Sequence, residues 1–130
     1  MKPKILIVDD DEAIAQQLFW TLCEEFEVTT ANNLSSAIRR ATAYEPDVSI
    51  LDLHLPPTQD SPDTGLRILD YVKQHLPSSK VFVASTDASP EVRRDCVRRG
   101  ADGFLSKPLD VESLLDTVRR AVLTRRLAAA

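Results

Sequence analysis

The sequence predicts an α/β protein of one domain, in which helices cover a parallel sheet. Five short runs of β-branched and apolar residues alternate with longer segments whose apolar residues recur every three or four positions. The length of 130 residues suits one domain, and the hydrophobic content of 43% supplies a core. A charged fraction of 28% with only 3 glycines argues against disordered and collagen-like proteins. No apolar run reaches the ~20 residues of a membrane helix and the start lacks a secretory signal, so we expect a soluble, cytoplasmic protein.

The predicted strands and helices follow one another in regular alternation. Strands are expected at residues 5–8, 28–31, 48–51, 81–84 and 103–105. The first of them reads Ile-Leu-Ile-Val, which is typical of a strand buried on both faces. Helices are expected over 11–25, after Asn33, from Gly65, after Ser89 and from Asp110. Right-handed crossovers between parallel strands then place helices on both faces of the sheet.

The helices carry their own sequence signals. In the first helix, three apolar side chains lie four residues apart on one face: Ile14, Leu18 and Leu22. Asn33 and Ser89 are suitable N-cap residues, and Pro90 suits a first helical position. Gly100 stands where the fourth helix should stop. The last helix has its apolar side at Val111, Leu114, Leu115, Val118 and Val122.

Polar residues follow four of the five predicted strands directly. They are Asp9-Asp10-Asp11 after the first, Asp52 after the third, Ser85-Thr86 after the fourth and Ser106-Lys107-Pro108 after the fifth. In open α/β sheets the ligand crevice lies beyond the carboxyl ends of the strands. The sequence therefore predicts that carboxylates, a hydroxyl group and an ammonium group meet at one edge of the sheet.

This combination of residue types indicates phosphoryl chemistry. Crowded carboxylates repel one another, and a hard divalent cation such as Mg²⁺ relieves that repulsion. An ammonium group and a Mg²⁺ ion can together neutralise phosphoryl oxygens. Taken alone, the three consecutive aspartates after the first strand could equally be a helix cap with favourable dipole charges. Asp52 and Lys107 together favour the metal site, and Asp11 is then expected to be only an acidic residue of the first helical turn.

The chain resembles the receiver domain of two-component response regulators over about residues 4–123. The resemblance is carried by Ile7-Val8-Asp9-Asp10-Asp11-Glu12, Asp52-Leu53-His54-Leu55-Pro56, Ser85-Thr86, Gly100-Ala101-Asp102-Gly103-Phe104 and Lys107-Pro108. It implies a flavodoxin-like, doubly wound (βα)5 fold with strand order 2-1-3-4-5. It also implies Mg²⁺ as the cofactor and a histidine kinase or phosphotransfer protein as the partner.

The resemblance further implies a role for each matching residue. Asp52 would accept the phosphoryl group and join Asp9, Asp10 and the backbone carbonyl of His54 around Mg²⁺, with Asp9 acting through a bound water. Lys107 would pair with phosphoryl oxygens. Two residues would act as the switch: the Ser85 hydroxyl would contact the phosphoryl group, and the Phe104 ring would follow it inward. The residues expected to tune dephosphorylation are His54 and Asp87.

These roles describe a signalling domain and not an enzyme. The chain would catalyse only its own phosphotransfer and autodephosphorylation. Phosphorylation would shift an existing equilibrium toward an active surface formed by the fourth helix, the fifth strand and the fifth helix, and so control an output.

The sequence departs from the family pattern in one loop. Gly65 comes nine residues after Pro56, whereas the family commonly has glycine after four, so five extra residues lie within 58–64. A tolerated surface insertion explains them, because lengthening a loop costs little entropy. A second interpretation is that the insertion reshapes kinase docking or shields the acyl phosphate.

The organisation of the chain is expected to be simple. We assign the receiver domain to 1–123 and a C-terminal tail to 124–130, either the start of a linker or an expression scar. The net charge of −4 argues against direct nucleic-acid binding. Residues 90–130 nevertheless carry 9 basic and 6 acidic side chains. Their arginine pairs are either solvated helix faces or a contact of a phosphorylation-dependent homodimer.

Three other residues carry expectations of their own. The Trp20 side chain is expected to be half-buried and to serve packing. Cys23 and Cys96 lack CxxC spacing, which argues against a disulfide or zinc site and predicts two buried thiols.

Three rival functions come from other classes of protein. A phosphatase with an aspartyl nucleophile also uses carboxylates and Mg²⁺, but its Asp-x-Asp pair should follow the first strand, where three consecutive aspartates stand here. A flavodoxin-like cofactor binder needs hydroxyl and amide donors rather than three acids. A phosphorylation-independent pseudo-receiver would be an interaction module, and it is disfavoured because every expected chemical residue is present.

Overall fold

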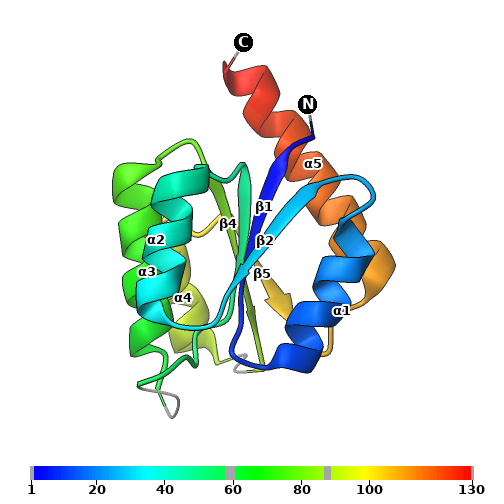
Figure 1. Cartoon of the computed structure of the whole chain (residues 1–130). Helices are drawn as coiled ribbons and strands as arrows, with labels where there is room; N and C mark the ends of the chain where they lie inside the picture. The colour runs from blue at the N-terminus through cyan, green and yellow to red at the C-terminus, as the bar shows by residue number, and fades with distance from the viewer. Residues whose placement is uncertain (1, 58–60, 87–88, 130) are drawn as a thin grey trace.

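The computed structural model describes residues 2–57, 61–86 and 89–129. Five strands and five helices alternate along the chain (Figure 1): β1 (Lys4–Val8), α1 (Glu12–Leu22), β2 (Glu27–Ala31), α2 (Leu34–Tyr44), β3 (Val48–Leu51), α3 (Asp63–His75), β4 (Lys80–Ser85), α4 (Pro90–Arg98), β5 (Gly103–Ser106) and α5 (Val111–Ala129). The strands form one parallel sheet in the order β2-β1-β3-β4-β5. Both the fold class and the strand order predicted from the sequence are confirmed.

The sheet divides the core into two apolar layers, because successive side chains of a strand point to opposite faces. Leu6 and Val8 of β1 pack in the layer under α2, α3 and α4, whereas Ile5 and Ile7 pack in the layer under α1 and α5. Figure 1 shows these two groups of helices on opposite sides of the sheet. These four apolar side chains of β1 are at most 1% exposed, as the Ile-Leu-Ile-Val run predicted.

The helix ends follow the sequence signals. Asn33 and Ser89 cap α2 and α4 through their side-chain oxygens, and Pro90 is the first residue of α4. Gly100 has a φ of 101° directly after α4, and Ala101 N–H donates to the carbonyl of Cys96 at 2.9 Å. A left-handed glycine that reverses the chain is the usual way in which a helix ends.

Three expectations differ from the structure in detail. The first helix is shorter than 11–25, because Asp11 is its N-cap and residues 23–25 form a turn, in which Glu25 N–H donates to the Leu22 carbonyl at 3.2 Å. Trp20 was expected to be half-buried, and this is wrong: the side chain is 72% exposed, since it lies opposite the buried Leu18 and Leu22 on α1. Of the two thiols, Cys96 is buried and Cys23 only partly so.

The last helix runs without interruption to Ala129. It therefore includes most of the segment 124–130 that was assigned to a tail. The boundary at residue 123 stays a prediction. Within the described ranges, no helix combines the length and the apolar character that crossing a bilayer requires.

Candidate functional site

The carboxyl edge of the sheet brings two aspartates together from distant parts of the chain. Asp9 follows β1 and donates its N–H to the carbonyl of Ala31, while Asp52 follows β3 and donates its N–H to the carbonyl of Val8. These bonds continue the ladder one residue beyond each strand. Asp9 and Asp52 are only 4% and 8% exposed, and carboxylates that deeply buried are uncommon unless they are paired.

Three carboxylates form an oxygen cluster suited to a metal ion. Asp9, Asp10 and Asp52 each offer one oxygen, and these atoms lie within 4.8 Å of one another. Hard cations such as Mg²⁺ and Ca²⁺ prefer carboxylate oxygens. The donor set therefore fits the cation that the sequence predicted.

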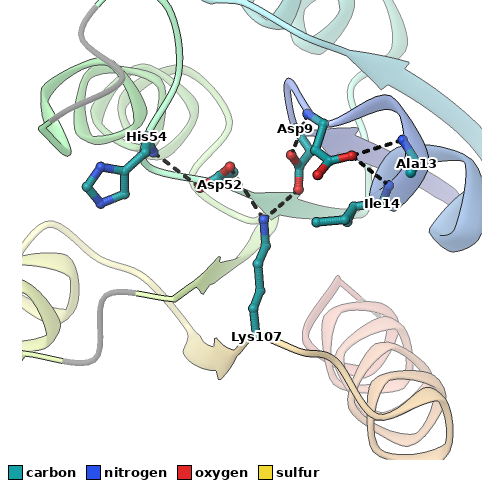
Figure 2. Close-up of polar contacts among 7 residues, drawn as sticks. Asp9, Ala13, Ile14, Asp52, His54 and Lys107 are labelled. Carbon is teal, nitrogen blue, oxygen red and sulfur yellow. Dashed lines mark hydrogen bonds and ion pairs between the residues drawn. The ribbon is translucent and has the colours of Figure 1, made fainter.

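Lys107, which directly follows β5, places its ammonium group beside the same carboxylates. Its Nζ lies 2.7 Å from Asp9 Oδ2 and 3.4 Å from Asp52 Oδ2, and the side chain is only 10% exposed. Figure 2 shows the ammonium group between the two aspartates, at the end of a side chain that enters from the β5 side. The backbone also anchors Lys107, whose N–H donates to the carbonyl of Ser85 at 3.1 Å. The peptide bond between Lys107 and Pro108 is cis.

The surroundings of Asp52 disfavour its negative charge. Burial raises the pKa of the Asp52 carboxyl group, the Lys107 ammonium group lowers it, and the nearby Asp9 carboxylate raises it again, so that the net direction is upward. A proton, an ammonium group or a divalent cation would each relieve this charge.

The pKa of Lys107 is displaced by the same group of charges. Burial by itself lowers this pKa, but the hydrogen bond that Lys107 donates to Asp9 and the charges of Asp9 and Asp52 outweigh burial and raise it. The lysine therefore stays an ammonium ion, a charge-assisted donor placed where phosphoryl oxygens are expected.

Asp11 has a structural role, close to the one expected for it. Its side chain accepts from Ala13 N–H at 3.0 Å and from Ile14 N–H at 3.3 Å and so caps α1. Its own N–H donates to Asp9 Oδ1 at 2.9 Å. The turn that begins α1 thus fixes one oxygen of Asp9, while Lys107 holds the other.

His54 reaches the site through its backbone. Its N–H donates to Asp52 Oδ1 at 3.2 Å. In Figure 2 the imidazole ring points away from Lys107 and the aspartates. This placement agrees with a site residue that acts through its main chain, although its role as a metal ligand stays a prediction.

The structure describes both predicted switch residues, Ser85 in β4 and Phe104 in the neighbouring strand β5. Ser85 is the last residue of β4 and only 1% exposed, and it pairs in register with Ser106. Phe104 is partly buried against the apolar layer under α2, α3 and α4. Asp87, the second residue expected to tune dephosphorylation, and positions 58–60 of the extended loop lie outside the described residues.

Sequence reasoning missed why Gly65 is needed at this site. Gly65 is the third residue of α3, and a Cβ atom built on it would lie 2.2 Å from Leu53 Cα and 2.8 Å from the carbonyl oxygen of Asp52. Its N–H donates to the carbonyl of Leu53 at 3.0 Å. The absence of a side chain therefore lets α3 support the backbone that carries Asp52. The sequence signal was a glycine near a helix start, which does not reveal what it approaches.

Arg93 is a second residue whose position the sequence did not reveal. It belongs to an arginine pair on α4, which suggested only a solvated face or a dimer contact. In the structure its guanidinium carbon lies 4.7 Å from the centroid of the Phe104 ring. Contacts between a helix and a neighbouring strand depend on tertiary packing, so no local pattern marks them.

The comparison with known proteins agrees with this geometry. Residues 5–119 match the family described as response regulator receiver domain. The chain is 36% identical over 130 residues to the transcriptional regulatory protein PrrA of Mycobacterium leprae and 32% identical over 128 residues to the nitrogen assimilation regulatory protein NtrX of Azorhizobium caulinodans. Each alignment covers 98% of this chain, but 53% of PrrA and 28% of NtrX.

Solved structures are similar over nearly the whole chain. The chemotaxis protein CheY4 of Vibrio cholerae superposes with a TM-score of 0.84 at 31% identity, covering 93% of this chain and 99% of that one. A CheY-like receiver domain of Methanospirillum hungatei gives a TM-score of 0.90 at 24% identity over 98% and 99% of the two chains, a likeness of fold. With the family match and the acidic edge, these findings lead to one assignment: the chain belongs to the response regulator receiver domain family of two-component signal transduction.

Proposed function

We propose that this chain accepts a phosphoryl group on Asp52 from the phosphohistidine of a histidine kinase or phosphotransfer protein, in a reaction that requires Mg²⁺. One observation carries the proposal: the Lys107 ammonium group lies between Asp9 and Asp52, within 3.4 Å of both carboxylates, at the cluster that Asp10 completes. A fixed cation beside a buried carboxylate is the arrangement that receives transferred phosphoryl oxygens.

The reaction follows from the roles of these side chains. An Asp52 carboxylate oxygen attacks phosphorus, and the phosphorus–nitrogen bond of the phosphohistidine breaks with its electron pair going to the imidazole. The product is an acyl phosphate on Asp52. Lys107 pairs with phosphoryl oxygens and leaves its contact with the Asp52 oxygen that becomes bonded to phosphorus.

The metal would be held by Asp9, Asp10, Asp52 and the backbone carbonyl of His54, with Asp9 acting through a water molecule. When bound, Mg²⁺ supplies the positive charge that offsets repulsion between the carboxylate and the incoming phosphoryl oxygens. The raised pKa of Asp52 supports this proposal, because it marks a carboxylate that its protein surroundings leave incompletely neutralised.

The consequence for signalling is a change in the surface formed by α4, β5 and α5. In this proposal the Ser85 hydroxyl contacts the phosphoryl group, Phe104 moves inward after it, and the altered surface controls an output or forms a homodimer. His54 and Asp87 set how readily water cleaves the acyl phosphate. The chain does not act as an enzyme on other substrates.

Intact-mass measurement after incubation with acetyl phosphate tests the proposal. Wild type should gain the mass of one phosphoryl group with Mg²⁺ and none after chelation, and Asp52→Asn should gain none in either condition. Asp116→Asn is the matched control, because it changes an exposed carboxylate of α5 and should label like wild type. Equal labelling of Asp52→Asn and wild type would refute the acceptor assignment.

A further inference from the structure

The guanidinium group of Arg93 holds two residues of β5 from the α4 side. Its carbon lies 4.7 Å from the centroid of the Phe104 ring, and Nη2 donates to Ser106 Oγ at 3.5 Å, the outer limit of a hydrogen bond. Residues 104 and 106 alternate along the strand and therefore present their side chains on the same face. One cation thus contacts both the partly buried Phe104 and the exposed Ser106 on that face of β5, just before Lys107.

The strand face under Arg93 is connected directly to the acidic site. In the register of the sheet, Val83 pairs with Phe104 and Ser85 pairs with Ser106. The next residue, Lys107, donates its N–H to the Ser85 carbonyl and its ammonium protons to Asp9 and Asp52. Phe104 therefore lies in β5 only three residues before Lys107, whose ammonium group the site requires.

We infer that Arg93 is a positioning residue, which stabilises the unphosphorylated state by holding the Phe104 ring against α4 through a cation–π contact. The inference rests on the proposed function, since it concerns the equilibrium that phosphorylation of Asp52 would shift. An inward movement of Phe104 toward Ser85 takes the ring away from the guanidinium group of α4. The contact therefore belongs to one of the two states, and its loss favours the other.

The size of the effect follows from the exposure of Arg93. A ligand that binds only the active state has an apparent dissociation constant divided by the fraction of protein in that state. Removing a contact that stabilises only the resting state raises this fraction. An exposed cation–π contact changes such an equilibrium by roughly two- to fivefold.

Beryllofluoride binding in the presence of Mg²⁺ measures this equilibrium, because the anion stands in for the phosphoryl group on Asp52. Arg93→Gln should bind it roughly two- to fivefold more tightly than wild type, whereas Arg93→Lys, which keeps a cation, should show a smaller change. Arg94→Gln is the matched control, since it removes the same charge from the neighbouring exposed position of α4 and should leave the affinity unchanged. In a Phe104→Leu background, Arg93→Gln should lose most of its effect.

A second measurement examines the contact without any ligand. A double-mutant cycle on Arg93 and Phe104, followed by urea unfolding of the unphosphorylated protein, should give a coupling equivalent to the same roughly two- to fivefold change in the folding equilibrium. No coupling in this cycle would overturn the inference, as would equal affinities of Arg93→Gln and Arg94→Gln for beryllofluoride. Failure of the wild type to bind beryllofluoride at all would instead refute the proposed function, even if the coupling were present.

Discussion

The carboxyl group of Asp52 is buried near the like charge of Asp9 and the opposite charge of Lys107. Because burial and Asp9 together raise its pKa above the ordinary 3.8, the folded chain binds a proton at Asp52 more readily than the unfolded chain does. Its charge therefore costs stability, and this cost grows as the pH rises from 3.8 through the raised pKa.

Asp52→Asn should consequently be more stable than wild type at pH 7 in the presence of a chelator. The expected gain in unfolding free energy is on the order of 1 kcal/mol, the size of a typical single-substitution effect. The gain should shrink as the pH falls through the raised pKa and should vanish below 3.8, where the wild-type carboxyl group is protonated in both states. Urea unfolding followed by circular dichroism measures it, and an unchanged or lowered stability at pH 7 would contradict the argument.

Mg²⁺ should stabilise the wild type, since an ion that binds only the folded chain adds to its unfolding free energy. At an ion concentration of 100 times the dissociation constant the gain is about 2.7 kcal/mol. Asp10→Asn should lose most of it, because one of the three clustered carboxylates becomes a neutral amide. Asp116→Asn should keep the whole gain. If Mg²⁺ stabilised Asp10→Asn against thermal unfolding as much as it stabilised the wild type, the ion would not be bound at this cluster.

Much of the site could be predicted from the sequence, because the carboxyl ends of parallel strands meet at one edge whatever the loops do. Asp9, Asp52 and Lys107 stand directly after strands, and the structure brings them together. The closer pairing of Lys107 with Asp9 than with Asp52 could not be predicted. It depends on side-chain distances of tenths of an ångström, to which strand order is insensitive.

At the scale of elements, the start of α3 packs closely against the backbone that follows β3. Gly65→Ala would place a Cβ atom 2.2 Å from Leu53 Cα, a distance that real Cβ atoms do not show, so one backbone must move. We expect a loss of roughly 1–3 kcal/mol in unfolding free energy and slower phosphorylation of Asp52, whose carbonyl oxygen lies 2.8 Å from the same Cβ.

The matched control for this substitution is Arg67→Ala, in the same helix but with an exposed side chain. It should stay within about 0.5 kcal/mol of wild type. Denaturant unfolding gives the stabilities, and acetyl phosphate labelling gives the rates. If the two alanine variants behaved alike, the close approach of α3 to β3 would not constrain the site.

The order and type of the elements were predictable because their signals are local: apolar periodicity, caps and a left-handed glycine. Their ends were less so. The first helix stops at Leu22 rather than residue 25, because residues 23–25 form a turn in which Glu25 N–H donates to the Leu22 carbonyl at 3.2 Å. Trp20 was misjudged for another reason. Amino-acid type alone favours burial of an indole, while its place in the helical period puts it on the side away from Leu18 and Leu22.

For the whole molecule, Asp47 at the amino edge of the sheet joins parts of the chain that are distant in sequence. Its side chain accepts from Lys4 N–H at 2.8 Å and forms an ion pair with Arg125 of α5. Its backbone carbonyl accepts from Lys80 N–H at 3.0 Å. One residue thus ties the first strand and the last helix to the entrance of β3.

Asp47→Ala should lower the unfolding free energy by roughly 1–3 kcal/mol, because the Arg125 charge and the Lys4 N–H lose a partly buried acceptor. Asp116→Ala removes a carboxylate that pairs with Arg120 at the surface and should change stability by less than about 1 kcal/mol. Chemical denaturation of both variants gives the comparison. Similar small losses would show that the amino edge does not depend on Asp47.

The exposed indole on α1 has a consequence for how this protein can be observed. Trp20 is the single tryptophan of the chain, and its side chain already faces water in the folded state. Its emission should therefore lie at long wavelength before any denaturant is added and shift little on unfolding. An optical probe of the interior would have to be introduced, for example by Phe82→Trp in the core together with Trp20→Phe.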